Sequence, residues 1–198
     1  IMVRGDGHDP HAECGTGATF LSIGPGWSSM CNTPFRRHKT WVHEGGIASP
    51  LIVHWPAGIR DHNKLRHNPC HFIDLLPTLV DLAGGKPQAS SVLPLAGRSL
   101  APALDKDGTV QRDFLYFNHN NNRAIRAGRH KLIATGKDGP WELYDLAKDR
   151  GEQRNIAATN PGLVAQMADR WKAADDDFVR VREASPPSGK TLMQRPAP

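Results

Sequence analysis

Basic side chains gather just ahead of two successive glycines, Gly45 and Gly46. The basic residues are Arg36, Arg37, Lys39 and His43. A lysine ammonium is a compact point charge that suits a tetrahedral anion such as sulfate or phosphate. A diglycine lets the backbone approach a ligand closely or take positive φ. The segment therefore predicts an anion-binding site; the alternative is a solvated basic face, in which Glu44 pairs with a neighbouring side chain.

The composition is that of a globular protein. The 198 residues allow one domain, or one domain with a small appendage. Hydrophobic residues make up 38% and charged residues 23%, which excludes a disordered chain of low hydrophobicity. The net charge is +5, but like charges do not form long runs, which disfavours a nucleic-acid-binding tail. No apolar run is long enough to span a membrane. The three cysteines form neither a zinc pattern nor a disulfide framework and leave the compartment, periplasmic or cytoplasmic, open.

The elements that would position the basic segment differ between the two halves of the chain. Up to residue 105, the sequence predicts a strand at 19–23, a turn at 24–26 and a short buried strand at 50–56. A helix begins at Asp74, with leucines along its apolar face, and ends at Gly84-Gly85. A second short helix is expected over 98–104. One strand with unpaired edges does not make a sheet, so this α/β piece is expected to be incomplete.

The second half predicts a small antiparallel sheet with a helix packed on it. Four short strand-like runs are separated by Asn-rich or Gly-containing turns, at 114–117, 123–126, 131–134 and 141–146. Asn160-Pro161 then begins a long helix with a regular apolar period. We therefore expect a first domain over 1–105, a sheet-and-helix subdomain over 106–184 and a loose tail over 185–198.

Several motifs, in this order and spacing, resemble the sulfatase family, specifically the arylsulfatases. The basic segment carries the first of them, because Lys39 stands five residues before Glu44-Gly45-Gly46. The others are Gly24-Pro25-Gly26-Trp27, 32–36, 50–59, 71–84, and 141–146 with Asp149, Glu152 and Asn155 after it. The resemblance extends to about residue 175.

The resemblance implies an alkaline-phosphatase-like α/β fold and hydrolysis of sulfate esters, with aryl sulfates expected. In that family the matching lysine binds the sulfate group, so the resemblance implies this role for Lys39. Arg36 and His43 are expected to line the same pocket, although the family pattern does not assign them. In the family reaction a hydrated formylglycine attacks sulfur while calcium and basic side chains hold the sulfate oxygens.

Two family features have no counterpart here. Formylglycine is made from the cysteine of a Cys-x-Pro-x-Arg motif, whereas Cys31 begins a Cys-x-x-Pro-x-Arg sequence, one residue too long. The Asp-Asp and Asp-Asn-Gly elements that bind calcium are also missing. We therefore expect no metal ligand in this chain. The nucleophile and the calcium site are expected in an N-terminal part of the same protein, and the chain alone should be inactive toward its sulfate ester.

Other functions stay open at this stage. A phosphodiesterase or a phosphonate hydrolase of the same superfamily would also use a lysine to hold its anion. A non-catalytic structural or binding module could keep the sulfatase C-terminal shape. A nucleic-acid module is the least favoured, because aromatic and basic residues do not alternate on a sheet face.

Overall fold

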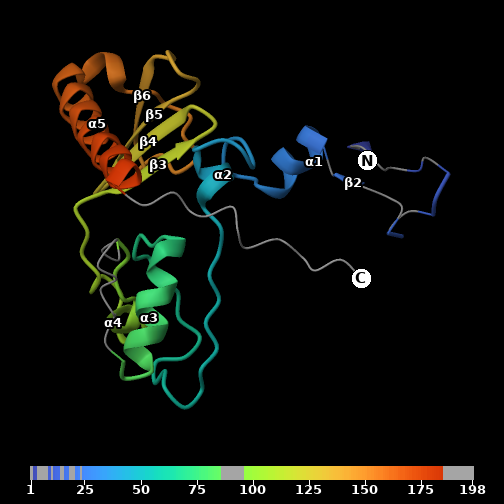
Figure 1. Cartoon of the computed structure of the whole chain (residues 1–198), viewed down its shortest axis with the longest axis vertical. Coiled ribbons are helices and arrows are strands. Elements are labelled where there is room, and N and C mark those ends of the chain that lie inside the picture. The colour runs from blue at the N-terminus through green and yellow to red at the C-terminus, as the bar shows by residue number, and fades with distance from the viewer. Residues whose placement is uncertain are drawn as a thin grey trace. The chain divides into compact units, whose positions relative to one another are not determined.

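The computed structural model describes residues 2–3, 9, 11–13, 16–17, 21–22, 24–85 and 96–184. Backbone contacts group the chain into two units, one of residues 1–51 with 116–169 and one of residues 52–115 with 170–198. Figure 1 shows the elements along the chain. The predicted division at residue 105 stays a prediction, and the predicted tail at 185–198 lies outside the described residues.

A four-stranded antiparallel sheet forms the centre of the first unit. Its strands are β3 (Leu115–His119), β4 (Asn122–Ala127), β5 (His130–Ala134) and β6 (Trp141–Asp145). They pair in the order β3-β4-β5-β6, as the predicted meander requires. Asn120 and Asn121 both have positive φ between β3 and β4, which is the backbone of a type I′ hairpin turn. The fold-class prediction is confirmed for this part of the chain.

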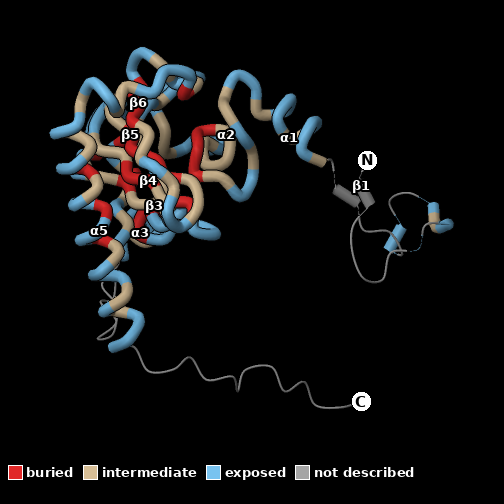
Figure 2. The backbone as a smooth tube through the Cα atoms, turned by 90° about the horizontal axis from the view of Figure 1, so that it is seen from above, coloured by how far each residue is buried: buried red, intermediate tan, exposed pale blue. Residues whose placement is uncertain are grey.

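Both faces of the sheet are buried, and they differ in chemistry. Ala124 pairs with Ile133, and Ile133 with Glu142, so these residues share one face, which we call face A. Two further residues of face A, Lys131 and Tyr144, are also paired. The opposite face carries the wholly apolar row Ile125, Leu132 and Leu143. In Figure 2 the buried residues concentrate in these strands and at the short helix α2 (Glu44–Ile47).

The long helix α5 (Pro161–Ala184) begins at the predicted Asn160-Pro161 signal. Its buried residues are Met167, Trp171 and Ala174. Their three- and four-residue spacing places them on one side of the helix, so the predicted helical period is confirmed.

The unit of residues 52–115 is built from short helices. They are η1 (Phe72–Asp74), α3 (Leu75–Leu82) and α4 (Ala101–Asp105). Asp74 stands at the start of α3 as predicted, and Gly84 follows its end with a φ of 70°. The predicted apolar face of α3 is not buried, however, since Leu76 and Leu79 are exposed. Pro77 and Thr78 form its buried side instead.

Two predicted elements are wrong. The segment 50–56 is extended but forms no strand, and its apolar side chains are exposed, with Ile52 at 88%. A buried strand needs hydrogen-bonding neighbours and cover on both faces, and no other described segment provides them. The turn expected at Gly24–Gly26 is the first turn of α1 (Gly24–Cys31), where Pro25 is tolerated because an early helical N–H has no partner. The predicted strand at 19–23 overlaps β2 (Leu21–Ser22), which pairs with β1 (Met2–Val3); positions 19, 20 and 23 lie outside the described residues.

Candidate functional site

The basic segment folds into a tight loop, residues 36–46, which we call the lysine loop. The backbone N–H of Trp41 donates to the carbonyl of His38 (3.1 Å), and that of Gly45 donates to the carbonyl of Arg36 (3.0 Å). Lys39 lies exposed in the middle of the loop. Within the described part of the chain, no side chain lies within hydrogen-bonding or ion-pair distance of its ammonium. The charge predicted to bind an anion is therefore accessible.

The backbone around Lys39 is strained. Arg37 has a φ of 71° and Thr40 a φ of 93°, and neither residue is glycine. Positive φ in a β-branched residue such as Thr40 is a genuine outlier, which costs on the order of 1–3 kcal/mol and persists only when the surroundings enforce it. The loop must therefore be held by contacts with other segments.

The two glycines allow close backbone packing within the lysine loop. Neither Gly45 nor Gly46 is among the residues with positive φ. A Cβ on Gly45 would collide with the backbone carbonyl oxygens of Arg36 and Arg37, and one on Gly46 with that of Trp41. The close approach that the diglycine permits is therefore between two parts of the same loop.

Glu44 is at the centre of a buried ion cluster. Its carboxylate accepts from the Lys131 ammonium (2.9 Å) and from Nε of Arg150 (2.9 Å). The same ammonium donates to Glu152 (2.8 Å), whose other oxygen accepts from the backbone N–H of Glu44 (2.9 Å). Burial alone would raise the pKa of Glu44, but the Lys131 and Arg150 charges outweigh it and the net shift is downward. For Glu152 burial prevails and raises the pKa.

Arg36 is held by the same face of the sheet. Its Nη1 donates to the Tyr144 hydroxyl (2.9 Å) and to the Glu142 carboxylate (3.4 Å). The Tyr144 hydroxyl in turn donates to Glu142 (2.6 Å). Burial, strengthened by that carboxylate, raises the pKa of Tyr144, so the hydroxyl keeps its proton. The guanidinium of Arg36 thus joins the start of the lysine loop to β6.

His43 lies inside the loop with no exposed surface. Burial, followed by the positive charges of Arg36 and Lys131, lowers its pKa to about 4, so the ring is neutral at pH 7. Neither ring nitrogen has a hydrogen-bond partner among the described residues, and Nε2 is 3.9 Å from the Glu142 carboxylate. Of the three predicted site residues, Lys39 is exposed, Arg36 is partly exposed with 33% of its side chain accessible, and His43 is buried. The substrate-binding roles of all three stay predictions.

The residues that hold the loop were not identified from the sequence as parts of the site. They are Asn122, Lys131, Glu142, Tyr144 and Glu152. One signal was available, because a lysine within a strand-like apolar run must find a carboxylate if it is buried. The motif residues Asp149 and Asn155 stabilise the backbone after β6. Asp149 accepts from two backbone N–H groups, and Asn155 accepts from the N–H of Leu143.

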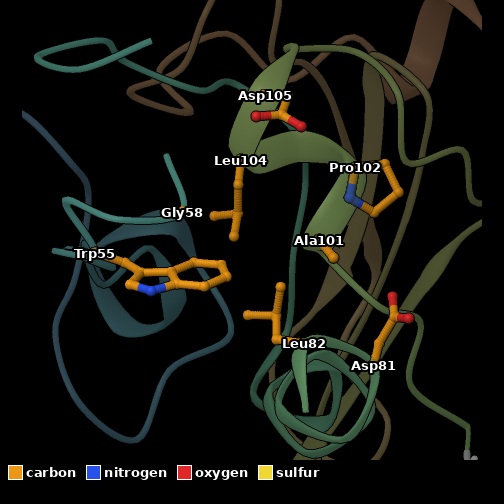
Figure 3. Close-up of a pocket in the computed structure, with 8 residues that line it drawn as sticks. All are labelled: Trp55, Gly58, Asp81, Leu82, Ala101, Pro102, Leu104 and Asp105. Carbon is orange, nitrogen blue, oxygen red and sulfur yellow. The ribbon is translucent and has the colours of Figure 1, made fainter. Parts of the chain in front are cut away.

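A separate concave surface lies within the unit of residues 52–115. Figure 3 shows the Trp55 ring with Leu82 and Leu104 extending toward the same space, and the Asp81 and Asp105 carboxylates farther from the ring. Its volume is about 340 Å³. None of the predicted site residues lines it.

The described residues include neither a cluster of potential metal ligands nor a helix suited to a membrane. Across residues 24–85, 96–184 and the few described positions before them, no group of three or more His, Cys, Asp or Glu side chains could hold a metal ion. In the same residues no helix combines the length and the apolar character that crossing a membrane requires.

Relatives of this chain are sulfatases. Residues 36–175 match the family described as N-sulphoglucosamine sulphohydrolase, C-terminal. An uncharacterized sulfatase of Schizosaccharomyces pombe is 31% identical over 180 residues, covering 81% of this chain and 32% of that protein. Human arylsulfatase A is 28% identical over 171 residues, covering 72% and 32%. Mouse N-acetylgalactosamine-6-sulfatase is 29% identical over 126 residues, covering 64% and 24%. The chain thus spans about a quarter to a third of the length of these relatives.

Solved structures agree on the fold. Ps i-CgsB in complex with k-i-k-neocarrahexaose matches with a TM-score of 0.60 at 22% identity, covering 79% of this chain and 38% of that one. A structure from Bacteroides thetaiotaomicron matches with a TM-score of 0.55 at 23% identity, covering 71% and 32%. At these identities the likeness concerns the α/β fold alone. The family match, in contrast, extends over more than half of the sequence and includes the whole lysine loop, and by it the chain belongs to the sulfatase family, corresponding to the C-terminal portion of its members.

Proposed function

We propose that this chain is the C-terminal part of an enzyme that hydrolyses sulfate esters, and that Lys39 binds the sulfate group. The observation that carries the proposal is the exposed ammonium of Lys39, which has no partner among the described residues although the loop around it is closely held. A free ammonium on an ordered loop is available to an anion.

The chemical role of Lys39 follows from its charge. Its ammonium binds a sulfate oxygen in the substrate complex and stabilises the negative charge that develops as the ester bond breaks. Because the loop is already ordered, little reorganisation accompanies that step. Attack on sulfur needs a nucleophile, which in sulfatases is formylglycine, and their reaction also uses calcium. Among the described residues no group of side chains could hold a metal ion, and Cys31 stands in a Cys-x-x-Pro-x-Arg sequence, so we derive no step from either group.

The partner of this chain is the N-terminal part of the sulfatase fold. Support comes from the unit of residues 52–115, where Phe72 is 77% and Leu79 is 65% exposed on η1 and α3. Large apolar side chains exposed together on one short helical segment are typical of an interface with another polypeptide segment. We propose that the N-terminal part covers them and supplies the nucleophile and the metal site.

The substrate class is a small-molecule sulfate ester. We propose an aryl sulfate as the first substrate to assay, because the sequence motifs resemble those of arylsulfatases. The relatives include both arylsulfatase A and an N-acetylgalactosamine-6-sulfatase, so a sugar sulfate is the matched comparison.

The test compares the 198-residue chain with the longer reading frame that contains it, using 4-nitrophenyl sulfate in the presence of calcium. We expect that the longer protein hydrolyses this ester and that the 198-residue chain does not. Calcium-dependent hydrolysis by the isolated chain would contradict the proposal that the N-terminal part supplies the nucleophile and the metal site. Faster turnover of a phosphonate monoester or a phosphodiester by the longer protein would contradict the sulfatase assignment.

Within the longer protein, Lys39→Ala tests the site itself. Removing the charge should cost roughly 2–4 kcal/mol of transition-state stabilisation, by analogy with the loss of one oxyanion donor. Lys148→Ala is the matched control, because Lys148 is equally exposed but lies outside the lysine loop. An unchanged kcat/KM in the Lys39→Ala variant would show that Lys39 does not contact the substrate.

A further inference from the structure

The lysine loop is held at three points by one face of the sheet. Asn122 Nδ2 donates to the carbonyl of Thr40 (3.1 Å), Lys131 pairs with Glu44 (2.9 Å), and the Tyr144 hydroxyl accepts from Arg36 (2.9 Å). Lys131 and Tyr144 are cross-strand partners on face A, and Asn122 lies on the same face of β4. Arg36, Thr40 and Glu44 are the beginning, the middle and the end of the loop.

The contact at Glu44 differs from the others because it is completely buried. The Lys131 side chain has no exposed surface and lies between the carboxylates of Glu44 and Glu152. A buried ammonium is tolerated only when its charge is paired and its hydrogen bonds are made, so these carboxylates have little freedom to move. Glu152 also accepts from the backbone N–H of Glu44, which fixes that residue through its main chain as well.

The contact at Thr40 has a different consequence. Thr40 follows Lys39 directly and has a φ of 93°. Such a conformation relaxes unless neighbouring contacts maintain it. The hydrogen bond from Asn122 at one end and the fixed Glu44 at the other leave the backbone of residues 40–44 little room to relax. The direction in which Lys39 leaves the backbone is therefore set from the sheet.

We infer that Lys131 and Glu152 are positioning residues for Lys39, and that through them the C-terminal sheet is part of the sulfate-binding apparatus. This inference rests on the proposed function for its catalytic consequence. Neither residue touches the substrate. Both act by fixing Glu44, which lies five residues after Lys39.

Hydrogen exchange on the 198-residue chain tests the positioning without any assay of activity. In Lys131→Met, we expect the amides of Trp41, Gly45 and Gly46 to exchange at least tenfold faster relative to the amides of β4 and β5. Glu152→Gln, which keeps the volume of the side chain, should produce a smaller change in the same amides. Lys172→Met is the matched control, because it removes a lysine from an exposed ion pair with Asp176 on α5. Unchanged protection of the three loop amides in both Lys131→Met and Glu152→Gln would overturn the inference.

A double-mutant cycle in the longer protein tests the catalytic consequence. Lys131→Met should lower kcat/KM for the sulfate ester at least tenfold when Lys39 is present, and less than twofold in a Lys39→Ala background, because it acts through that lysine. Equal losses in both backgrounds would mean that Lys131 is merely structural, and would overturn the inference. If the single variant Lys39→Ala retains full activity, the proposed sulfate-binding role of Lys39 is wrong. The hydrogen-exchange measurement would still decide whether the sheet holds the loop. Should Lys131→Met not fold, Glu152→Gln carries both measurements.

Discussion

The carboxylate of Asp74 lies 2.6 Å from the guanidinium of Arg112, and the Asp74 side chain is completely buried. The same carboxylate accepts from the backbone N–H groups of His71 (2.7 Å) and Arg98 (2.9 Å). One side chain therefore joins the start of α3 to two later segments of the unit of residues 52–115. The same unit also has a small buried apolar cluster of Leu100, Ala103 and Val110, and Asp74 adds a buried polar contact between its segments.

Replacing Asp74 should destabilise this unit strongly. Asp74→Ala removes all three hydrogen bonds and leaves the nearly buried Arg112 without its counter-ion, which should cost about 3–5 kcal/mol of unfolding free energy. Urea unfolding measures the change. Asp177→Ala is the control, because Asp177 pairs with Arg180 on the exposed surface of α5, and its loss should have no measurable effect. Similar midpoints for the two variants would contradict this account of Asp74.

The buried His43 should make stability depend on pH. Burial, with Arg36 and Lys131 nearby, lowers its pKa from 6.5 to about 4, so below pH 6.5 the unfolded chain binds a proton that the folded chain does not. Its contribution to stability is therefore present above pH 6.5 and is lost as the pH falls toward 4. The loss should reach at most about 3 kcal/mol over that window.

Urea unfolding at pH 7 and pH 4.5 measures this dependence. A His43→Gln variant should lose less stability between these pH values than the unmodified chain. His54→Gln is the matched control, because His54 is exposed in the folded chain, and it should leave the pH dependence unchanged. A His43 ring that titrates near pH 6.5 in NMR spectra would show that it is not buried as described.

The diglycine should tolerate no side chain. In Gly46→Ala the new Cβ would collide with the backbone carbonyl of Trp41, which cannot move away without breaking the loop. We expect a loss of about 1–3 kcal/mol in unfolding free energy, as for other overpacked sites. Gly162→Ala is the control, since a Cβ there has open space within α5 and should be neutral or slightly stabilising. Equal stabilities of the two variants would mean that the loop is looser than described.

The exposed side of α3 should matter for association and not for local stability. Leu79→Gln should leave the unfolding free energy of the 198-residue chain unchanged, because that leucine is already 65% exposed. It should reduce the tendency of the isolated chain to self-associate, measured by sedimentation, and lower the thermal stability of the longer protein. Leu100→Gln is the contrast, because Leu100 is buried and its replacement should destabilise the chain itself. A destabilised isolated Leu79→Gln chain would indicate that α3 is already covered.

The sequence predicted those elements whose signals are local. The four strands of the sheet and the helix beginning at Pro161 were found because their alternation, turns and caps lie within a few residues. The strand expected at 50–56 failed for a physical reason: its apolar residues indicate burial, but a strand forms only where a neighbour supplies hydrogen bonds. For α3, the leucines were correctly read as a helix face, yet the face that the chain itself buries carries Pro77 and Thr78.

The site could be predicted only in part. The role of Lys39 is implied by the resemblance to sulfatases, through its place five residues before Glu44-Gly45-Gly46, and it stays a prediction; the structure shows that the residue is exposed. Lys131 could not be assigned to Glu44, because the local sequence can indicate that a buried lysine needs a carboxylate but not which carboxylate, 87 positions away, supplies it. Arg36 and His43 were grouped with Lys39 because they are close in sequence. In the structure Arg36 donates to the Tyr144 hydroxyl of the sheet and His43 is enclosed, and their substrate-binding roles stay predictions.

The sequence distance between the lysine loop and face A has a consequence for synthesis. The loop and the residues that hold it are 82 to 116 positions apart. At about 5–20 residues per second, a ribosome releases Lys39 some five to twenty seconds before Glu152. Before Lys131 has been made, Glu44 has neither of its counter-ions, and before Asn122 has been made, the hydrogen bond to the Thr40 carbonyl is missing. A nascent polypeptide that stops before β5 would therefore carry the lysine but not its orientation, and the binding loop takes its final form only after Glu152 has been made.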